Sequence, residues 1–172
     1  MQLSTRAKQV PGSPTLAVTA KVAQMRAQGV DIIGFGAGEP DFATPEYIRD
    51  AGKRGLDEGW TRYTPAGGLP AVKNAAIDHM QRHFALEADA KEVMISCGGK
   101  HVLYNALMCL CNDGDEVLLP APYWVTYPVQ IELAGGKPVI VPSSSENNFR
   151  VKVSDLEAAC TPRTKGIIIN SP

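Results

Sequence analysis

Four short apolar runs alternate with segments of helical pattern, and this alternation limits how the chain can fold more than any other feature. The runs are continuously apolar, which is typical of parallel strands buried on both faces. Strands joined by helices indicate an α/β domain with a mostly parallel sheet. The predicted strands are residues 93–96, 116–119, 138–141 and 166–169, and the predicted helices that separate them are 99–111, 123–134 and 153–160.

The N-terminal third also predicts helices. Apolar residues recur at helical spacing before Gly29, a residue type that commonly ends a helix. Residues 31–35 predict a short strand. The run Thr44–Pro45–Glu46 predicts a helix start, with Thr44 as the cap and Pro45 as the first helical residue, and the helix extends to Gly59. A further helix is predicted after Pro70.

Composition and charge exclude several classes of protein. The 172 residues have a formal net charge of −1 and no block of like charges, which argues against nucleic-acid and anionic-membrane partners. No apolar run approaches the roughly 20 residues that span a bilayer, so we expect a cytoplasmic protein. His79 and His83 lie one helical turn apart, but without a third ligand we interpret them as solvated residues rather than a zinc site.

The four cysteines fit neither a disulfide framework nor a CxxC metal motif. Cys109 and Cys111 could form half of a metal site. We interpret them instead as buried, reduced thiols at the end of a helix.

Ligands of open parallel sheets bind beyond the carboxyl ends of the strands. Residues that could bind a ligand follow three of the predicted strands. Gly98, Gly99 and Lys100 open a helix after the first strand, a combination that suits a phosphate group. Trp124 follows the second strand and can stack on a planar ring. Asn170 follows the fourth. An anion site beside the flat face of Trp124, which we call the aromatic plate, suits a phosphorylated aromatic cofactor.

Each of these features also has a purely structural reading. The glycines suit an ordinary turn between strand and helix, Trp124 suits a core or interface position, and Asn170 suits a turn. Their coincidence at successive strand ends is what favours a site.

Six motifs occur in an order that resembles the class I aminotransferases, in particular bacterial aspartate aminotransferases with a Gly-Gly-Lys cofactor turn. The resemblance covers nearly the whole chain. Its motifs are residues 37–42 (AGEPDF), 63–70 (YTPAGGLP), 98–100 (GGK), 122–128 (PYWVTYP), 162–165 (PRTK) and 170–172 (NSP).

The resemblance implies the fold of the pyridoxal-phosphate-dependent transferases, an α/β fold with a three-layer large domain. Residues 1–44 would contribute to the small domain and the substrate loop, and residues 45–172 would form the first part of the large domain. The implied cofactor is pyridoxal 5'-phosphate, held by the turn at Gly98, Gly99 and Lys100 and by stacking on Trp124. In a homodimer, Tyr63 would reach the cofactor phosphate of the neighbouring subunit.

The resemblance further implies transfer of an amino group from an aspartate-like amino acid to a 2-oxo acid. Gly38 would contact the substrate carboxylate through its backbone, and Trp124 would also contact the substrate. Lys100 would pair with the side-chain carboxylate of a dicarboxylic substrate.

The family's catalytic lysine, which forms the Schiff base, has no counterpart here, and neither has the aspartate that pairs with the ring nitrogen. We therefore expect a truncated large domain without catalytic residues, inactive alone, whose last strand exposes apolar surface. Two alternatives stay open. One is a non-catalytic module that binds a phosphate ligand or dimerises, and the other is part of a different enzyme of the same fold, such as a β-lyase or cyclising lyase.

Overall fold

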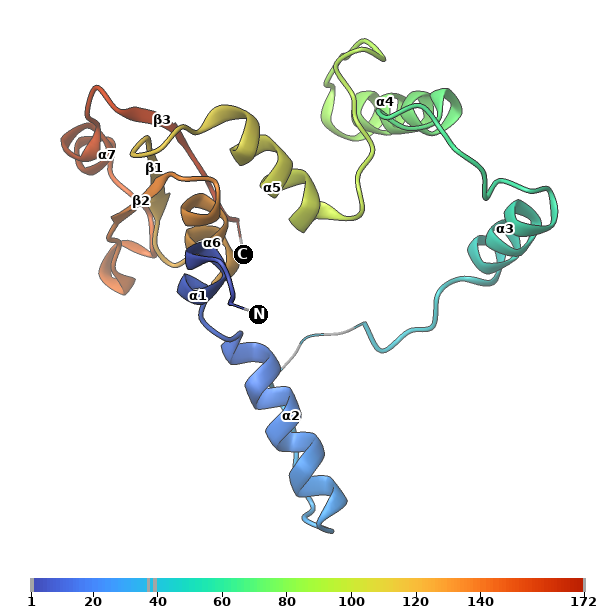
Figure 1. Ribbon diagram of the computed structural model, residues 1–172, viewed down its shortest axis with the longest axis horizontal. Helices are drawn as coiled ribbons and strands as arrows, with labels where there is room; N and C mark the ends of the chain where they lie inside the picture. The colour runs from blue at the N-terminus through green and yellow to red at the C-terminus, as the bar shows by residue number, and fades with distance from the viewer. Residues whose placement is uncertain (1, 37, 39, 172) are drawn as a thin grey trace. The chain divides into compact units, whose positions relative to one another are not determined.

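The computed structural model describes residues 2–36, 38 and 40–171 (Figure 1). The chain divides into two compact units, residues 1–63 and residues 64–172, which we describe separately as unit 1 and unit 2. In the part of the chain that the structure describes, no helix is both long and apolar enough to cross a bilayer.

Unit 1 contains three helices: α1 (Thr5–Gln9), α2 (Pro14–Ala27) and α3 (Glu46–Asp57). The Ser13 hydroxyl caps α2 by accepting a hydrogen bond from the Leu16 amide at 3.4 Å. As predicted, α2 ends just before Gly29, whose φ of +79° favours glycine.

Two predictions for unit 1 are wrong. Residues 31–35 form no strand, because no neighbouring strand pairs with them in the described residues, and Arg26 donates a hydrogen bond to the Ile32 carbonyl instead. At the start of α3, Pro45 occupies the cap position rather than Thr44, without a side-chain hydrogen bond to the helix.

Unit 2 contains the sheet and the remaining helices. They follow in the order α4 (Pro70–Phe84), α5 (Gly99–Leu110), β1 (Glu116–Pro120), α6 (Thr126–Leu133), β2 (Lys137–Val141), the 3₁₀ turn η1 (Ser145–Asn147), α7 (Val153–Ala159) and β3 (Thr164–Ile167). The three strands are parallel and lie in the order β2–β1–β3. Glu116 pairs with Lys137 on one side of β1 and with Thr164 on the other.

The core lies between the central strand and two helices. Alternate residues of a strand face opposite sides of the sheet, and Val117 and Leu119 pack with Leu107 of α5 and Ile131 of α6. Leu118, only 3% exposed, therefore faces the other side. Figure 1 shows α6 and α7 on opposite sides of the sheet, so unit 2 has the three layers expected from the sequence.

The strand order creates a switch point. The chain leaves β1 for β2 on one side through α6, and then returns across β1 to β3 on its other side through α7. Crossovers in opposite directions leave a crevice at the carboxyl ends of the central strands, where ligands of such sheets bind. In unit 2 this crevice lies beyond β1 and β3.

Three further predictions need correction. Residues 93–96 form no strand, since no strand lies beside them in the described residues, although the Ile95 amide donates to the Gly67 carbonyl at 3.1 Å. The last strand begins two residues earlier than predicted, at Thr164. Cys109 is exposed rather than buried. Cys111 is half-buried, and burial, followed by the nearby Asp115 carboxylate, raises the pKa of its thiol.

Candidate functional site

The predicted anion turn stands at the start of α5. Gly98 is the cap residue, with φ +83° and ψ 165°, a conformation that residues with a side chain rarely adopt. A Cβ built on Gly98 or Gly99 would meet nothing within 4 Å. The space beside the turn is therefore open to a ligand.

The first amides of α5 are free to bind an anion. Among the described residues, the backbone N–H groups of Gly99 and Lys100 have no acceptor, whereas those of His101 and Val102 donate to the Gly98 carbonyl. No side chain caps the helix. Free amides and the positive end of the helix dipole together favour a bound anion at this end of α5.

Lys100 and Trp124 come together although 24 positions separate their numbers in the sequence. The ammonium nitrogen of Lys100 lies 4.8 Å from the centroid of the Trp124 ring, which is a cation–π contact. Trp124 is 41% exposed, so part of its ring remains available for stacking. The structure thus joins the predicted anion turn to the predicted aromatic plate.

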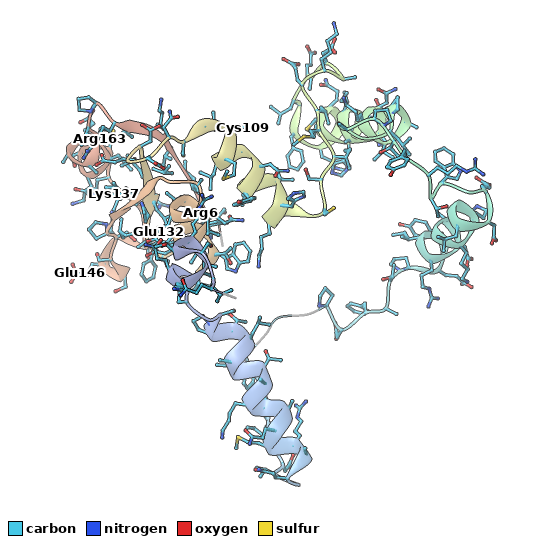
Figure 2. The ribbon with its side chains drawn as sticks, viewed as in Figure 1. Arg6, Cys109, Glu132, Lys137, Glu146 and Arg163 are labelled. Carbon is cyan, nitrogen blue, oxygen red and sulfur yellow. The ribbon has the colours of Figure 1, made fainter. Side chains whose placement is uncertain are left out.

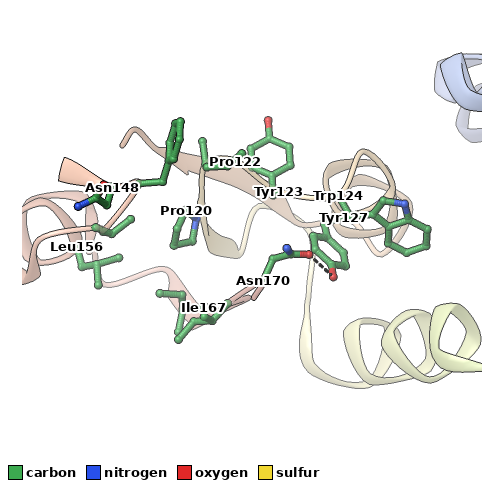
Figure 3. A pocket seen from close by; sticks show the side chains of 13 residues that line it. Pro120, Pro122, Tyr123, Trp124, Tyr127, Asn148, Leu156, Ile167 and Asn170 are labelled. Carbon is green, nitrogen blue, oxygen red and sulfur yellow. Dashed lines mark hydrogen bonds between the residues drawn. The ribbon is translucent and has the colours of Figure 1, made fainter. Parts of the chain in front are cut away.

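Tyr127 fixes the aromatic plate from its edge. Its ring lies edge-on to Trp124, with 5.5 Å between the ring centroids and 82° between the planes. Its hydroxyl donates a hydrogen bond to Oδ1 of Asn170 at 2.9 Å (Figure 3). Because Oδ1 accepts this bond, the Asn170 amide nitrogen keeps its donors for another partner. Asn170, predicted from its place after a strand, thus lies beside Tyr127 and lines the same cavity.

A cavity of about 900 Å³ opens at this end of the sheet. Its walls come from the segment after β1, the end of β3 and the segment before α7 (Figure 3). Trp124, Tyr127 and Asn170 lie on its wall, together with the apolar residues Pro120 and Ile167. The turn at Gly98 and Gly99 does not line the cavity and connects to it through Lys100 and Trp124.

Gln130 of α6 supports the first turn of α5. The residue is 4% exposed, and its Nε2 donates a hydrogen bond to the Lys100 carbonyl at 2.7 Å. Its Oε1 is buried and has no partner in the described part of the chain. Neither Tyr127 nor Gln130 was predicted from the sequence. The usable signal for Gln130 was a polar residue between the apolar Val129 and Ile131 on a predicted core helix.

A charged cluster occupies the opposite end of β1. Glu116 is 3% exposed and accepts hydrogen bonds from the Thr161 hydroxyl at 2.6 Å and from Arg163 at 3.0 Å. Lys137 lies 3.7 Å away, and Figure 2 shows it with Arg163 on this part of unit 2. The hydrogen bond from Thr161 lowers the pKa of Glu116, burial opposes this shift, and Arg163 lowers the pKa further. This cluster stabilises the sheet at the end away from the cavity.

The two other predicted site residues belong to unit 1. Tyr63 is fully exposed and Gly38 is exposed, so both are accessible to a ligand or a partner. The neighbours of Gly38 in its predicted turn, Ala37 and Glu39, lie outside the described residues.

Comparison with known sequences identifies one family. The family described as aminotransferase class I and II matches residues 30–172. The aspartate aminotransferase of Bacillus sp. (strain YM-2) is 49% identical over 170 residues, which are 99% of this chain and 43% of that protein. The probable aspartate/prephenate aminotransferase of Aquifex aeolicus is 47% identical, with 99% and 43% of the two chains covered. The chain thus spans less than half the length of these relatives.

Comparison with solved structures identifies proteins of the same kind. A structure of aspartate aminotransferase from Thermus thermophilus with maleate matches with a TM-score of 0.96 and 39% identity, over 100% of this chain and 45% of that one. The aspartate aminotransferase of Rhizobium meliloti matches with a TM-score of 0.93 and 37% identity, over 100% and 43% of the two chains.

Proposed function

Because this chain belongs to the aminotransferase class I and II family, we propose that it forms the cofactor-anchoring part of an enzyme that transfers amino groups with pyridoxal 5'-phosphate. The donor is an aspartate-like amino acid and the acceptor is a 2-oxo acid. The observation that supports the proposal is the contact of Lys100 with Trp124, because it brings the start of α5, whose free amides suit an anion, beside an aromatic face.

The residues present fit this cofactor. The phosphate would bind the free amides of Gly99 and Lys100, where a Cβ on either glycine would meet open space. The pyridine ring would stack on Trp124. When bound, the cofactor supplies the electron sink for transamination, and the protein supplies binding, orientation and charge.

Side chains of unit 2 would set the orientation of the bound ring. Tyr127 holds the Trp124 plate from its edge, and its hydroxyl holds Asn170, so two walls of the cavity are fixed by one residue. Pro120 and Ile167 give one side of the cavity an apolar wall. A ring bound against these walls would be held in one orientation relative to a substrate.

Lys100 supports a dicarboxylic substrate. Its ammonium group is exposed, so it can pair with a carboxylate while it stays near the ring face. Two comparisons agree with this choice. The relative from Thermus thermophilus was solved with maleate, which has two carboxylates. The relative from Aquifex aeolicus carries the name aspartate/prephenate aminotransferase.

Three residue roles and the domain division extend the proposal. Gly38 would contact the substrate carboxylate through its backbone, and Trp124 would touch the substrate as well as the ring. Tyr63 would reach the phosphate in the second subunit of a homodimer, a role that its full exposure permits. Residues 1–44 would belong to the small domain and residues 45–172 to the large domain.

Catalysis needs a lysine amine that bonds to the cofactor and moves the substrate's α-proton. In this proposal the backbone amide of Lys100 binds the phosphate, so its side chain would not serve as this lysine. The 172-residue chain alone should therefore bind the cofactor without turning over aspartate and 2-oxoglutarate. Turnover by the purified chain would contradict this part of the proposal.

The binding test uses the two tryptophans. Pyridoxine 5'-phosphate lacks the aldehyde, so it binds without bonding to lysines, and its stacking on Trp124 should quench tryptophan fluorescence. Trp124→Phe should remove the quench. The matched control, Trp60→Phe, changes an exposed residue of unit 1 that donates to Glu58 and should leave the quench intact. An unchanged quench in Trp124→Phe would refute the stacking role.

A further inference from the structure

The start of α5 has little rigidity of its own. Gly98 and Gly99 carry no side chains, no side chain caps the helix, and the first free amides belong to Gly99 and Lys100. Glycine lets the backbone take many conformations. An anion site made of such amides needs support from another element to keep them aimed at one point.

Gln130 is the side chain that gives this support. Its Nε2 donates to the Lys100 carbonyl at 2.7 Å, a short bond that α6 makes to the first turn of α5. Tyr127 lies three positions earlier on α6, so the two side chains share a face of this helix. One short helix therefore holds both the aromatic plate, through Tyr127, and the anion turn, through Gln130.

Stability alone does not explain an amide at this position. The Lys100 carbonyl requires the NH₂ group of Gln130, so Oε1 must point the other way, where it is buried without a donor. A buried acceptor without a partner is destabilising, and an apolar side chain of the same size would avoid that cost. The side-chain amide of Gln130 therefore lowers stability, but it fixes the backbone at Lys100.

We propose that Gln130 is a positioning residue of the anion site: it fixes the first turn of α5 so that the Gly99 and Lys100 amides converge on a phosphate group while Lys100 stays over Trp124. This proposal rests on the proposed function, because the phosphate it serves is that of the cofactor. Its consequence is that Gln130 controls how strongly the protein prefers a phosphorylated ligand to the same ligand without phosphate.

The test measures the ratio of dissociation constants for pyridoxine and pyridoxine 5'-phosphate, by tryptophan quenching in the protein that carries this sequence. Gln130→Met keeps the volume and removes the donor, so the ratio should fall about fivefold, as expected for one hydrogen bond. Affinity for pyridoxine itself should change little, because ring stacking on Trp124 does not use this bond. Gln130→Glu, which also lacks the Nε2 donor, should lower the ratio in the same direction.

The matched control is Ile131→Val, which changes a neighbouring residue of α6 that is 0% exposed and apolar. It should lower the melting temperature and leave the ratio at the wild-type value, which separates positioning from general stability. A wild-type ratio in either folded Gln130 variant overturns the proposal. A wild-type protein that binds both ligands equally overturns the phosphate site itself, and with it the proposed function.

Discussion

The ammonium nitrogen of Lys100 lies 4.8 Å from the centroid of the Trp124 ring. In the proposed function, Lys100 would hold a second carboxylate of the substrate near this ring. In an active protein that carries this chain, Lys100→Met should lower kcat/KM for aspartate relative to alanine by about tenfold or more, because charge-assisted hydrogen bonds contribute roughly 1.5–3 kcal/mol.

The control for Lys100 is Lys53→Met, which removes an exposed lysine of α3 that pairs with Asp50 three positions earlier. Its aspartate-to-alanine ratio should equal that of the wild type. Equal losses for aspartate and alanine in Lys100→Met would exclude a role for this residue in recognising the side-chain carboxylate.

Gly98→Ala should destabilise the turn, because a residue with a Cβ at φ +83° and ψ 165° costs about 1–3 kcal/mol. Its affinity for pyridoxine 5'-phosphate should fall, while its affinity for pyridoxine should not. Gly52→Ala, within α3 and with no atom within 4 Å of the added Cβ, should instead stabilise by about 0.5–1 kcal/mol. Chemical denaturation and ligand titration measure both effects, and a stabilised Gly98→Ala would contradict the observed turn.

The Glu116 cluster predicts a pH dependence of stability. The pKa of Glu116 is lowered in the folded protein, so the stabilisation is present above the unfolded pKa of about 4.3 and is lost as pH falls through the folded value. Thr161→Val removes the hydrogen bond that contributes most to this shift. Its melting temperature should therefore lie below that of the wild type at pH 7, and the difference should shrink toward pH 3.5.

A threonine elsewhere provides the comparison. Thr19 donates to the Thr15 carbonyl one turn earlier in α2, a partner that does not titrate, so Thr19→Val should shift the melting temperature equally at both pH values. If Thr161→Val behaved in the same way, the cluster would not be the source of the pH dependence.

Leu119→Ala should destabilise unit 2 by about 2–5 kcal/mol, because Leu119 is 0% exposed at the centre of the core. Ile33→Ala changes a residue of unit 1 that is 82% exposed and should stay within about 0.5 kcal/mol of the wild type. Urea unfolding compares the two, and similar effects would contradict the position of the core.

The sequence predicted those strands and helices whose apolar pattern alone shows which of their faces are buried. β1 and β2 were found because continuous apolar runs fit strands covered on both faces. The turn at Gly98 was found because two glycines precede a helical pattern, although the strand predicted before them is absent. Residues 93–96 have the same apolar pattern and form no strand, because a strand also needs a lateral neighbour, and the pattern does not say whether one is present.

The unpredicted part of the site consists of contacts across long separations. Tyr127 and Asn170 are 43 positions apart, and Gln130 and Lys100 are 30 positions apart. Each bond depends on how α6 is rotated against the sheet and α5, which is set by core packing at Ile131 and Leu107. The rotation of α6 cannot be predicted from the composition of the chain or from the spacing of its residues.

The position of β1 between two strands that follow it in the chain has a consequence for synthesis. As the polypeptide leaves the ribosome, β1 can pair with β2 while β3 has still to be made. At roughly 5–20 residues per second, β3 arrives one to several seconds later. During that interval one edge of β1 has no neighbour, and the cavity lacks the wall that Ile167 and Asn170 provide. This cavity can therefore form only after the segment that contains β3 has been translated.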